Sequence, residues 1–247
     1  MNIGLCGLGK AGRQLVEYTI DNEKYNLKAV LCRDESRTAG KTVTDITNLR
    51  TKDNIVIQKI SEFSNLEKLD VIIDFSNSET TMKIVEICVA QKINLVICPT
   101  NFTDDQIETI KKRAIESNIG VVFAPTLTIG INMLIDSVVK ISSLFSDFNF
   151  EIVERHSKFK ASPTKTAQII SKSICREDVP ISSIRLDGYV GEHEVTATNG
   201  FERISIIHES FSRVAFVKGS LIAADFICEH KGYFEMRDIF KKLIASV

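Results

Sequence analysis

The sequence has no uninterrupted apolar run that approaches the roughly 18 residues of a transmembrane helix. It also has no excess of charge of either sign: 31 Lys and Arg residues are balanced by 32 Asp and Glu residues, which gives a formal net charge of −1. This balance argues against a nucleic-acid-binding or membrane-surface protein. The first residues, Met1 to Leu5, enter a strand-like run without the basic segment of a signal peptide. These absences predict a cytoplasmic protein with neither nucleic acid nor membrane as a partner.

Cysteines are few and scattered. The six lie at positions 6, 32, 88, 98, 175 and 228, and no two form a Cys-x-x-Cys pair. Cys6, Cys88 and Cys98 lie inside apolar runs, which favours buried free thiols over disulfides or zinc ligands. We therefore expect no metal site.

Apolar strands alternate with helical patterns in the first half of the chain. Strands are expected at 3–6, 27–32, 71–75, 93–98 and 120–125. Helices are expected at 13–20, 80–91 and 104–117, the last with Thr103 as its N-cap. Such alternation is typical of parallel sheets covered by helices on both faces. We expect an α/β fold with a Rossmann-type doubly wound parallel sheet.

The second half has a different pattern of expected helices and strands. This pattern predicts a second, α+β domain with a mixed or antiparallel sheet. Its strands alternate polar and apolar residues between glycine turns, as antiparallel strands do. Strands are expected at 148–154, 181–186, 192–198 and 202–209, and helices at 129–144, 166–174 and 210–228. We place the boundary near Leu127 and expect the last helix to return to the first domain. The domains are then 1–127 with about 219–247, and 128–218.

A Gly-x-Gly-x-x-Gly motif lies between the first strand and the first helix. Glycines there allow a tight turn and close approach of a pyrophosphate, and the helix N-terminus offers unpaired N–H groups. A strand before the motif and a helix after it are the context that dinucleotide binding requires. The alternative is a merely tight turn. The expected cofactor-binding residues of this turn are Gly7, Leu8, Gly9, Lys10, Ala11 and Gly12.

The end of the second strand bears on which dinucleotide binds. An acidic residue there would hold the ribose 2′-OH of NADH, whereas this strand ends Cys32-Arg33-Asp34. Arg33 can hold a 2′-phosphate, so we expect NADPH to be preferred, with NADH possible. In the alternative, Arg33 faces solvent and Asp34 holds the ribose.

Cations and hydroxyls are concentrated in residues 154–167, ERHSKFKASPTKTA. His156, Lys158, Lys160 and Lys165 fall within ten residues, in a chain of nearly zero net charge. Taken alone, such a run is most simply interpreted as a solvated loop. The alternative is a site whose cations attract an anion and donate a proton.

At this point the sequence resembles the dihydrodipicolinate reductase family, nearly from end to end. The segments that carry the resemblance are GLGKAGRQ near the start, VIIDFSNSE at 71–79, CPTNF at 98–102, APTLTIGIN at 124–132, EIVERHSKFKASPTKTA at 151–167, GYVGEHEV at 188–195, ISIIHESFSRVAFVKGSLIAADFI at 204–227 and GYFEMRDIF at 232–240. The resemblance implies NAD(P)H-dependent reduction of a cyclic, α,β-unsaturated imine dicarboxylate in lysine and diaminopimelate biosynthesis. It implies a dinucleotide-binding first domain, and a second domain that binds this small dicarboxylate and forms a homotetramer.

The family's substrate motif, Glu-x-His-His-x-x-Lys-x-Asp-x-Pro-Ser-Gly-Thr-Ala, corresponds to Glu154, His156, Lys160 and Thr166-Ala167 here. The resemblance implies that His156 and Lys160 assist proton donation, which suits a reduction in which an anionic enamine must be protonated. Ser157 replaces the second histidine, Lys165 replaces the glycine, and the segment before Pro163 is one residue shorter. The implied substrate-binding residues are Ser157, Thr164, Lys165 and Thr166.

The resemblance also implies cofactor contacts after three strands of the first domain. The family's Gly-Thr-Thr-Gly is Cys98-Pro99-Thr100-Asn101 here, and its Ala-Pro-Asn ends in Thr126. Because Pro99 has no N–H, contacts on the nicotinamide side must differ from the family's. The implied residues are Phe75, Cys98, Pro99, Thr100, Ala124, Pro125, Thr126 and Leu127.

Some alternatives stay open at this stage. His193 and His208 lie on alternating strands and suit structural or interface roles as well as substrate binding. The departures from the motif leave room for a different imine or carbonyl reductase, or for a dinucleotide-binding sensor without turnover.

Overall fold

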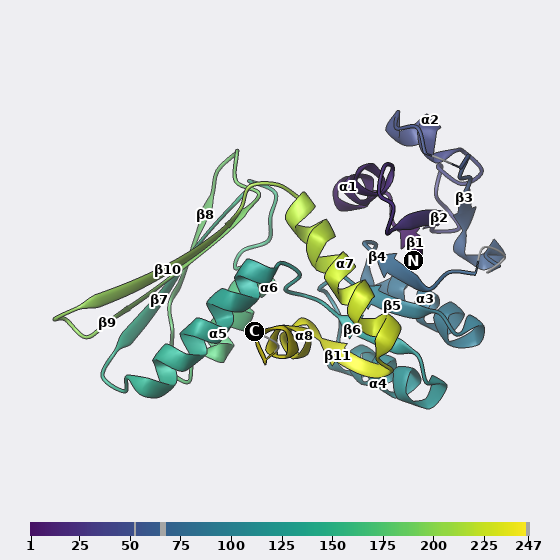
Figure 1. Ribbon diagram of the computed structural model, residues 1–247. Helices are drawn as coiled ribbons and strands as arrows, with labels where there is room; N and C mark the ends of the chain where they lie inside the picture. The colour runs from purple at the N-terminus through teal and green to yellow at the C-terminus, as the bar shows by residue number, and fades with distance from the viewer. Residues whose placement is uncertain (52, 65–67, 246–247) are drawn as a thin grey trace. The chain divides into compact units, whose positions relative to one another are not determined.

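The chain forms two units in the computed structural model, which describes residues 1–51, 53–64 and 68–245 (Figure 1). The first unit comprises Met1–Pro125 with Phe216–Val247, and the second comprises Thr126–Ala215. The boundaries expected from the sequence were 127/128 and about 218/219. Each unit is described by itself below.

The first unit contains a seven-stranded sheet in the order β11-β6-β5-β4-β1-β2-β3, in which every pair of neighbours is parallel. Its central strands are buried on both faces, which explains their continuous apolar sequences. This sheet confirms the expected Rossmann-type fold. Its strands are β1 (Asn2–Cys6), β2 (Asn26–Cys32), β3 (Ile57–Lys59), β4 (Val71–Asp74), β5 (Asn94–Ile97), β6 (Gly120–Phe123) and β11 (Gly232–Glu235).

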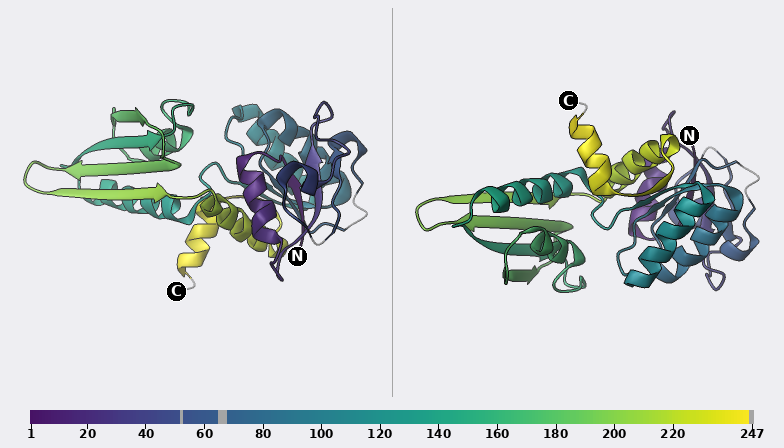
Figure 2. Two further views of the ribbon diagram at one scale, coloured as in Figure 1. Left: turned by 90° about the horizontal axis from the view of Figure 1, so that it is seen from above. Right: turned by 90° about the horizontal axis from the view of Figure 1, so that it is seen from below.

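Helices cover both faces of this sheet. Figure 2 shows α3 (Ser78–Gln91) and α4 (Asp104–Ser117) on one face and α1 (Lys10–Thr19) and α7 (Val214–Glu229) on the other. Thr103 caps α4 in a capping box with Gln106, so the predicted N-cap is confirmed. The last strand and helix, β11 and α8 (Met236–Ala245), extend the unit beyond α7.

Several short elements of this unit were not predicted. They are α2 (Val43–Thr47), β3, the 3₁₀ turn η1 (Ile60–Glu62), β11 and α8. Four of them have only three to five residues, which carry too little periodic pattern to stand out. Helix α8 has ten residues and was missed although its length would have allowed a helical pattern to be recognised. Strand β11 adds to the edge of the sheet beside β6, and its pairing partner lies more than 100 residues earlier in the chain.

The second unit contains a four-stranded sheet in the order β10-β9-β7-β8. Strands β9 and β10 pair antiparallel, as do β7 and β9, but β8 is parallel to β7. The expected mixed or antiparallel sheet is thus confirmed as a mixed one. Only the antiparallel direction suggested by the alternation of β8 was wrong, because the crossover through α6 returns the chain in the same direction. The elements are α5 (Ile129–Leu144), β7 (Asn149–His156), α6 (Lys165–Ser173), β8 (Ile181–Arg185), β9 (Gly191–Thr198) and β10 (Arg203–Ser210).

The core of the second unit lies between its sheet and the helices α5 and α6. Ile131, Leu134 and Val138 of α5 pack against the inner face of the sheet, together with Ala167 and Ile170 of α6. One row of this inner face is wholly apolar, because Ile181, Ile152, Val195 and Ile206 are paired across the four strands. The row two residues further along is polar, and it forms the site described below.

The cysteines are free thiols, as predicted from their spacing. Cys6, Cys32 and Cys88 are buried, and Cys98 is half-buried. Within the part of the chain that the structure describes, no helix has both the length and the apolar character needed to cross a membrane.

Candidate active site

Two glycines of the first turn have no room for a side chain. Gly7 has φ +90°, and a Cβ there would lie 2.9 Å from the carbonyl carbon of Phe75. A Cβ on Gly12 would lie 2.0 Å from the carbonyl oxygen of Gly7. Because both contacts are with backbone, neither position tolerates another residue. The turn between β1 and α1 is therefore fixed as tight.

Gly9 differs from these two because a Cβ there would meet nothing within 4 Å. It is the N-cap of α1, and no side chain caps the helix, whose first residues are Lys10 and Ala11. Uncapped N–H groups beside open space suit a phosphate at a helix N-terminus. The turn from Gly7 through Leu8 to Gly12 thus fits the pyrophosphate of a dinucleotide.

Other residues expected at the cofactor follow neighbouring strands at the carboxyl edge of the same sheet. Phe75 follows β4, Cys98-Pro99-Thr100 follows β5, and Ala124-Pro125 follows β6. Ligands of open α/β sheets bind at this edge. The last two expected residues, Thr126 and Leu127, belong to the second unit.

Asp74, at the end of β4, is a fully buried carboxyl group that the sequence analysis did not single out. It accepts hydrogen bonds from the backbone N–H of Ser76 at 2.8 Å and from the hydroxyl of Thr81 at 2.5 Å. Burial raises its pKa, although these hydrogen bonds act in the opposite direction. Asp74 fixes the turn that contacts Gly7.

Arg33 and Asp34 have separate surroundings at the end of β2. The Arg33 side chain is exposed, and its guanidinium makes no hydrogen bond or ion pair among the described residues. Oδ1 of Asp34 accepts a hydrogen bond from the backbone N–H of Ser61 at 3.0 Å. Hydrogen bonds from Ser61 lower the pKa of Asp34. One oxygen of Asp34 is therefore engaged within the protein, whereas Arg33 is free to meet a ligand.

In the second unit, β7 places Glu154 and His156 on the inner face of the sheet. This strand continues to His156, two residues beyond its expected end, so both side chains project from a strand rather than from a loop. Arg155 lies between them on the opposite face, where it pairs with Glu192 and Glu194.

Glu154 lies in a polar row that crosses the whole sheet. It is opposite Ser183 on β8 and opposite His193 on β9, and His193 is opposite His208 on β10. Glu154 is fully buried, and His193 has an exposed fraction of only 5%. The middle of the row therefore lies in the interior, directly beside the apolar row, and Ser183 and His208 at its ends are half-buried.

The Glu154 carboxylate is surrounded by donors. Its Oε1 accepts hydrogen bonds from the Thr164 N–H at 3.1 Å, the Ser183 hydroxyl at 2.6 Å and the Arg185 guanidinium at 2.7 Å. Its Oε2 accepts one from the Thr164 hydroxyl and lies 3.3 Å from His156 Nδ1. Burial acts to raise the pKa of Glu154, but the contacts with His156, Ser183, Thr164 and Arg185 outweigh it and hold the pKa well below its ordinary value. The group is a carboxylate at neutral pH.

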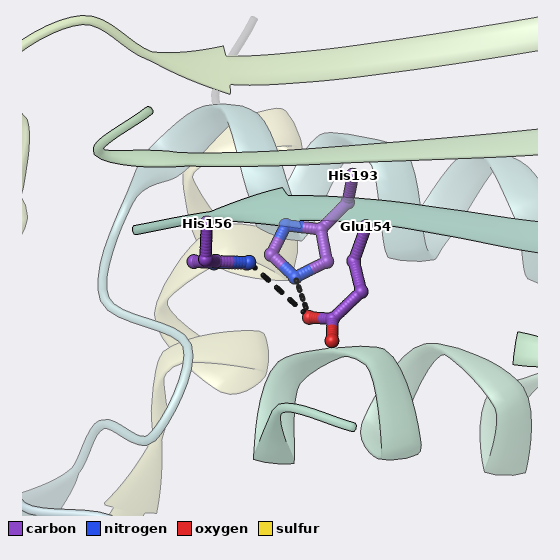
Figure 3. A group of neighbouring side chains, drawn as sticks. All are labelled: Glu154, His156 and His193. Carbon is purple, nitrogen blue, oxygen red and sulfur yellow. Dashed lines mark ion pairs between the residues drawn. The ribbon is translucent and has the colours of Figure 1, made fainter. Parts of the chain in front are cut away.

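Two histidines flank this carboxylate, as Figure 3 shows. The rings of His156 and His193 meet edge to face, with centroids 5.0 Å apart. Nε2 of His193 lies 3.9 Å from Glu154 Oε2 and 3.4 Å from the Thr164 hydroxyl oxygen. Burial, together with the nearby His156, lowers the pKa of His193 to about 3. His193 is therefore neutral in the folded protein.

Glu154, His156 and His193 bring three possible metal-ligand atoms within 4.8 Å of one another. A Glu and two His are a donor set that zinc accepts. Here, however, the carboxylate already receives hydrogen bonds from Thr164, Ser183 and the cationic Arg185. The arrangement therefore suits the holding of protons better than the binding of a cation.

The N-terminus of α6 lies beside this group. Thr164 is its N-cap and is buried, with its hydroxyl accepting from the Ala167 N–H and donating to Glu154. This hydroxyl is directed into the protein rather than toward a ligand. The N–H groups of Lys165 and Thr166, in the first turn of the helix, have no partner among the described residues. They are donors of the kind that hold a carboxylate.

The rest of the charged segment connects β7 to α6. The Lys160 side chain is exposed, and its backbone N–H bonds to the carbonyl of Ser157 at 3.0 Å. Arg185 donates to the carbonyls of Lys160 and Ala161 at 2.9 and 2.6 Å. Lys158 points elsewhere and pairs with Asp187 at 2.8 Å.

Ser183, Arg185 and His193 are the members of this site that the sequence analysis did not assign to it. Ser183 and Arg185 are two residues apart, so the alternation of β8 placed them on one face. The alternation could be recognised in the sequence, but the register that places these residues opposite β7 could not. His193 was left between a structural and a substrate-binding role, and the structure places it against His156.

The two units define a class of protein, the two-domain dinucleotide-dependent oxidoreductases. A dipicolinate-bound dihydrodipicolinate reductase from Paenisporosarcina sp. TG-14 is similar, with a TM-score of 0.78 and 20% identity, covering 95% of this chain and 97% of that chain. An amine dehydrogenase from Mycobacterium smegmatis is similar with a TM-score of 0.71 and 8% identity, covering 96% and 95%. At these identities the likeness shows the fold.

Sequence comparison identifies the family. Residues 1–127 match the model of the dihydrodipicolinate reductase N-terminus, and residues 130–240 match that of its C-terminus. The 4-hydroxy-tetrahydrodipicolinate reductase of Buchnera aphidicola subsp. Baizongia pistaciae is 31% identical over 97% of both chains. That of Thermosipho africanus is 33% identical over 82% of this chain and 93% of the relative. The chain belongs to the dihydrodipicolinate reductase family, and it is an NAD(P)H-dependent oxidoreductase of lysine and diaminopimelate biosynthesis.

Proposed function

We propose that this chain reduces 4-hydroxy-tetrahydrodipicolinate, the substrate after which its relatives are named, with NADPH as the preferred reductant and with His156 and Lys160 supplying the proton. The observation that carries this proposal is the buried Glu154 carboxylate, 3.3 Å from Nδ1 of His156. A histidine beside a fixed carboxylate is an arrangement that enzymes use to orient a proton donor. The cationic Lys160 is anchored close by through its backbone.

The NADPH preference rests on Arg33. Its exposed guanidinium, at the end of β2, is placed to form a charge-assisted contact with a 2′-phosphate. Asp34, which would have to hold the ribose hydroxyls of NADH, already accepts a hydrogen bond from Ser61 through one of its two oxygens. The alternative in which Asp34 determines the cofactor is thereby disfavoured.

The substrate dicarboxylate would be held by α6. The N–H groups of Lys165 and Thr166 offer two donors at a helix N-terminus, where the helix dipole also favours an anion. The exposed Lys165 ammonium adds a positive charge at the position where the family has glycine. Thr164, the N-cap of α6, fixes the start of the helix and so positions these N–H groups. Ser157 immediately follows β7, and its side chain is half-buried.

The chemistry first requires loss of the substrate's 4-hydroxyl group, which leaves as water together with a proton from the neighbouring carbon and gives the conjugated imine. It then requires one hydride and one proton. A nicotinamide cofactor, when bound, would supply the hydride to the carbon that had carried the hydroxyl. The anionic enamine that results gains its proton on the neighbouring carbon from His156 or Lys160. The cations of the segment stabilise the negative charge while it develops.

A homotetramer is proposed through the outer face of the four-stranded sheet. On this face Ile184 and Ile207 expose 42% and 59% of their surface, and the Arg155 ion pairs lie between them. Light scattering of the purified protein would test the proposal, and a monomer at micromolar concentration would contradict it.

The test of the function is a spectrophotometric assay of NADPH oxidation. We expect oxidation only when 4-hydroxy-tetrahydrodipicolinate, the product of the preceding synthase step, is supplied. Oxidation with unrelated imines or ketones but not with this compound would indicate a different reductase on the same scaffold. Binding of NADPH without oxidation of the cofactor under any of these conditions would indicate a sensor.

A further inference from the structure

The two ring nitrogens of His156 have different surroundings. Nδ1 is buried and lies at ion-pair distance, 3.3 Å, from Glu154 Oε2, and it has no hydrogen-bond partner among the described residues. Nε2 lies on the other side of the ring, where a Cβ at position 191 would stand only 3.0 Å away. Figure 3 shows the ring edge-on, with one nitrogen turned toward the carboxylate.

The state of Glu154 decides which nitrogen of His156 carries the fixed proton. An ionised carboxylate only accepts hydrogen bonds, and Arg185, Ser183 and Thr164 all donate to Glu154. Its approach to His156 is therefore favourable only if Nδ1 is protonated. The ring is then left with Nε2 as the nitrogen that can exchange a proton with a ligand.

Gly191 determines whether Nε2 is accessible. It is the first residue of β9 and a neighbour of Ser210 in the register. A Cβ at this position would lie 3.0 Å from Nε2 and 3.3 Å from Cδ2 of the same ring. Gly191 does not have the positive φ that would itself demand glycine, so space beside the ring is the reason for glycine here.

We propose that Glu154 and Gly191 are positioning residues for His156: Glu154 keeps a proton on Nδ1, and Gly191 leaves the space through which Nε2 gives its proton to the substrate. The inference rests on the proposed function, in which His156 is a proton donor.

In the proton-transfer step the Nε2–H bond of the imidazolium breaks, and its electron pair stays on the nitrogen. A C–H bond forms from the enamine electron pair, on the carbon next to the one that received the hydride. The ring remains neutral, with its proton on Nδ1 facing Glu154. A proton from solvent restores Nε2–H for the next turnover.

The other charged groups near His156 are compatible with this role. Arg185, opposite His156 on β8, is engaged with Glu154 and with backbone carbonyls. His193, on β9, is held neutral against the ring. Lys160, on the segment that follows β7, is exposed. Thr164, at the start of α6, contributes no charge. Glu154 is thus the anion that faces Nδ1.

The first test is a spectroscopic measurement of the tautomer. In ¹⁵N-labelled protein, long-range ¹H–¹⁵N correlation spectra distinguish a histidine protonated at Nδ1 from one protonated at Nε2. We expect neutral His156 to be the Nδ1–H form in the wild type, and to change to the Nε2–H form in Glu154→Gln, whose amide N–H can face Nδ1. An Nε2–H tautomer in the wild type would overturn the proposal, whatever the activity.

The second test is kinetic. Glu154→Gln should lower kcat on the order of 10²-fold with a much smaller change in KM, and should flatten the dependence of kcat on pH. Glu154→Asp, which restores the charge, should recover part of the loss. Glu86→Gln is the matched control, because Glu86 also pairs with an arginine but lies in the first unit. Equal kcat values for Glu154→Gln and the wild type would overturn the role of Glu154.

The third test uses Gly191→Ala, which adds one methyl group without backbone strain. We expect kcat to fall by up to about 10²-fold, because the ring must move to clear a Cβ that would lie 3.0 Å from Nε2, and misplacing a catalytic group by about 1 Å has that effect. In a His156→Ala background the same change should have no further effect, since the ring that it displaces is gone. Unchanged kcat in Gly191→Ala would remove the role of Gly191. If His156→Ala itself is fully active, the proposed proton donor fails, whereas normal Glu154 and Gly191 variants with an inactive His156→Ala refute only the positioning.

Discussion

The hydroxyl of Tyr25 donates a hydrogen bond to Oδ2 of Asp225 at 2.8 Å, although the two residues are 200 positions apart. The same carboxylate oxygen accepts from Lys24 Nζ at 2.6 Å. Tyr25 is the residue immediately before β2, and its side chain is largely buried. Asp225 lies on α7. This contact joins the C-terminal part of the first unit to its N-terminal part.

The first prediction concerns this contact. Asp225→Ala should lower the free energy of unfolding by about 0.5–1.5 kcal/mol, because the part-buried Tyr25 hydroxyl loses its partner. Tyr25→Phe in the Asp225→Ala background should recover part of that loss by removing the unpaired group. Urea denaturation of the three proteins measures the effect. Equal stability of Asp225→Ala and the wild type would show that the contact is not formed in solution.

The second prediction concerns Arg33. Arg33→Ala should raise the KM for NADPH about tenfold or more, because a charge-assisted contact contributes about 1.5–3 kcal/mol. The KM for NADH should stay nearly the same. Steady-state kinetics with each cofactor decides the matter, and equal effects on both would remove the assignment of the 2′-phosphate to Arg33.

The third prediction concerns the proton donors. His156→Ala and Lys160→Ala should each lower kcat by about 10²–10⁴-fold, with much smaller changes in KM, because the lost interaction belongs to the transition state. Lys158→Ala is the control, since Lys158 pairs with Asp187, and it should behave like the wild type. Full activity in both test variants would mean that the segment is a solvated charged loop.

The fourth prediction concerns Lys165. Lys165→Ala should mainly raise the KM for the substrate, because an ammonium group near the carboxylate is removed. Lys165→Gly should recover some affinity by giving the substrate closer access to the N–H groups of the helix N-terminus. An increase in KM that is larger for Gly than for Ala would contradict this account of the position.

The fifth prediction concerns pH. His193 has a pKa of about 3 when folded, against about 6.5 when unfolded, so between these values the unfolded chain binds the extra proton. Stability therefore falls as the pH falls through this window, by up to about 1.4 kcal/mol per pH unit. His193→Gln should show a shallower slope between about pH 6.5 and 5.5, where Glu154 in the unfolded chain, with a pKa of about 4.3, is still almost fully ionised. Denaturation at several pH values compares the slopes, and identical slopes would contradict a buried neutral His193.

The fold was predictable where the sequence carries strong local signals. Helix α4 begins where expected because Thr103 and Gln106 form its capping box, and it ends where expected, before Asn118 in the left-handed conformation. Helix α5 has the expected bounds because its apolar residues keep helical spacing. The direction of β8 was not predictable, because alternation marks a strand without indicating which way it runs. Strand β3 and helix α2 are too short to produce a period.

The site was predictable only in part, for a similar reason. The motif brought out Glu154 and His156, which are close in sequence, but Ser183, Arg185 and His193 join them through strand register. Register depends on the packing of the whole sheet and not on any local pattern. The roles given to individual residues, the homotetramer and the cytoplasmic location stay predictions for the experiments above.

One carboxylate and one guanidinium hold both ends of the segment between β7 and α6. Glu154 is bonded to Thr164, where α6 begins, and Arg185 holds Glu154 together with the carbonyls of Lys160 and Ala161. The intervening residues can therefore change in number without moving His156 or the start of α6, which accounts for the tolerance of a segment one residue shorter than the family motif. In engineering terms, residues 162 and 163 are an exchangeable insert between two fixed anchor points, and the substrate end of the enzyme can be varied there without rebuilding its proton-donating end.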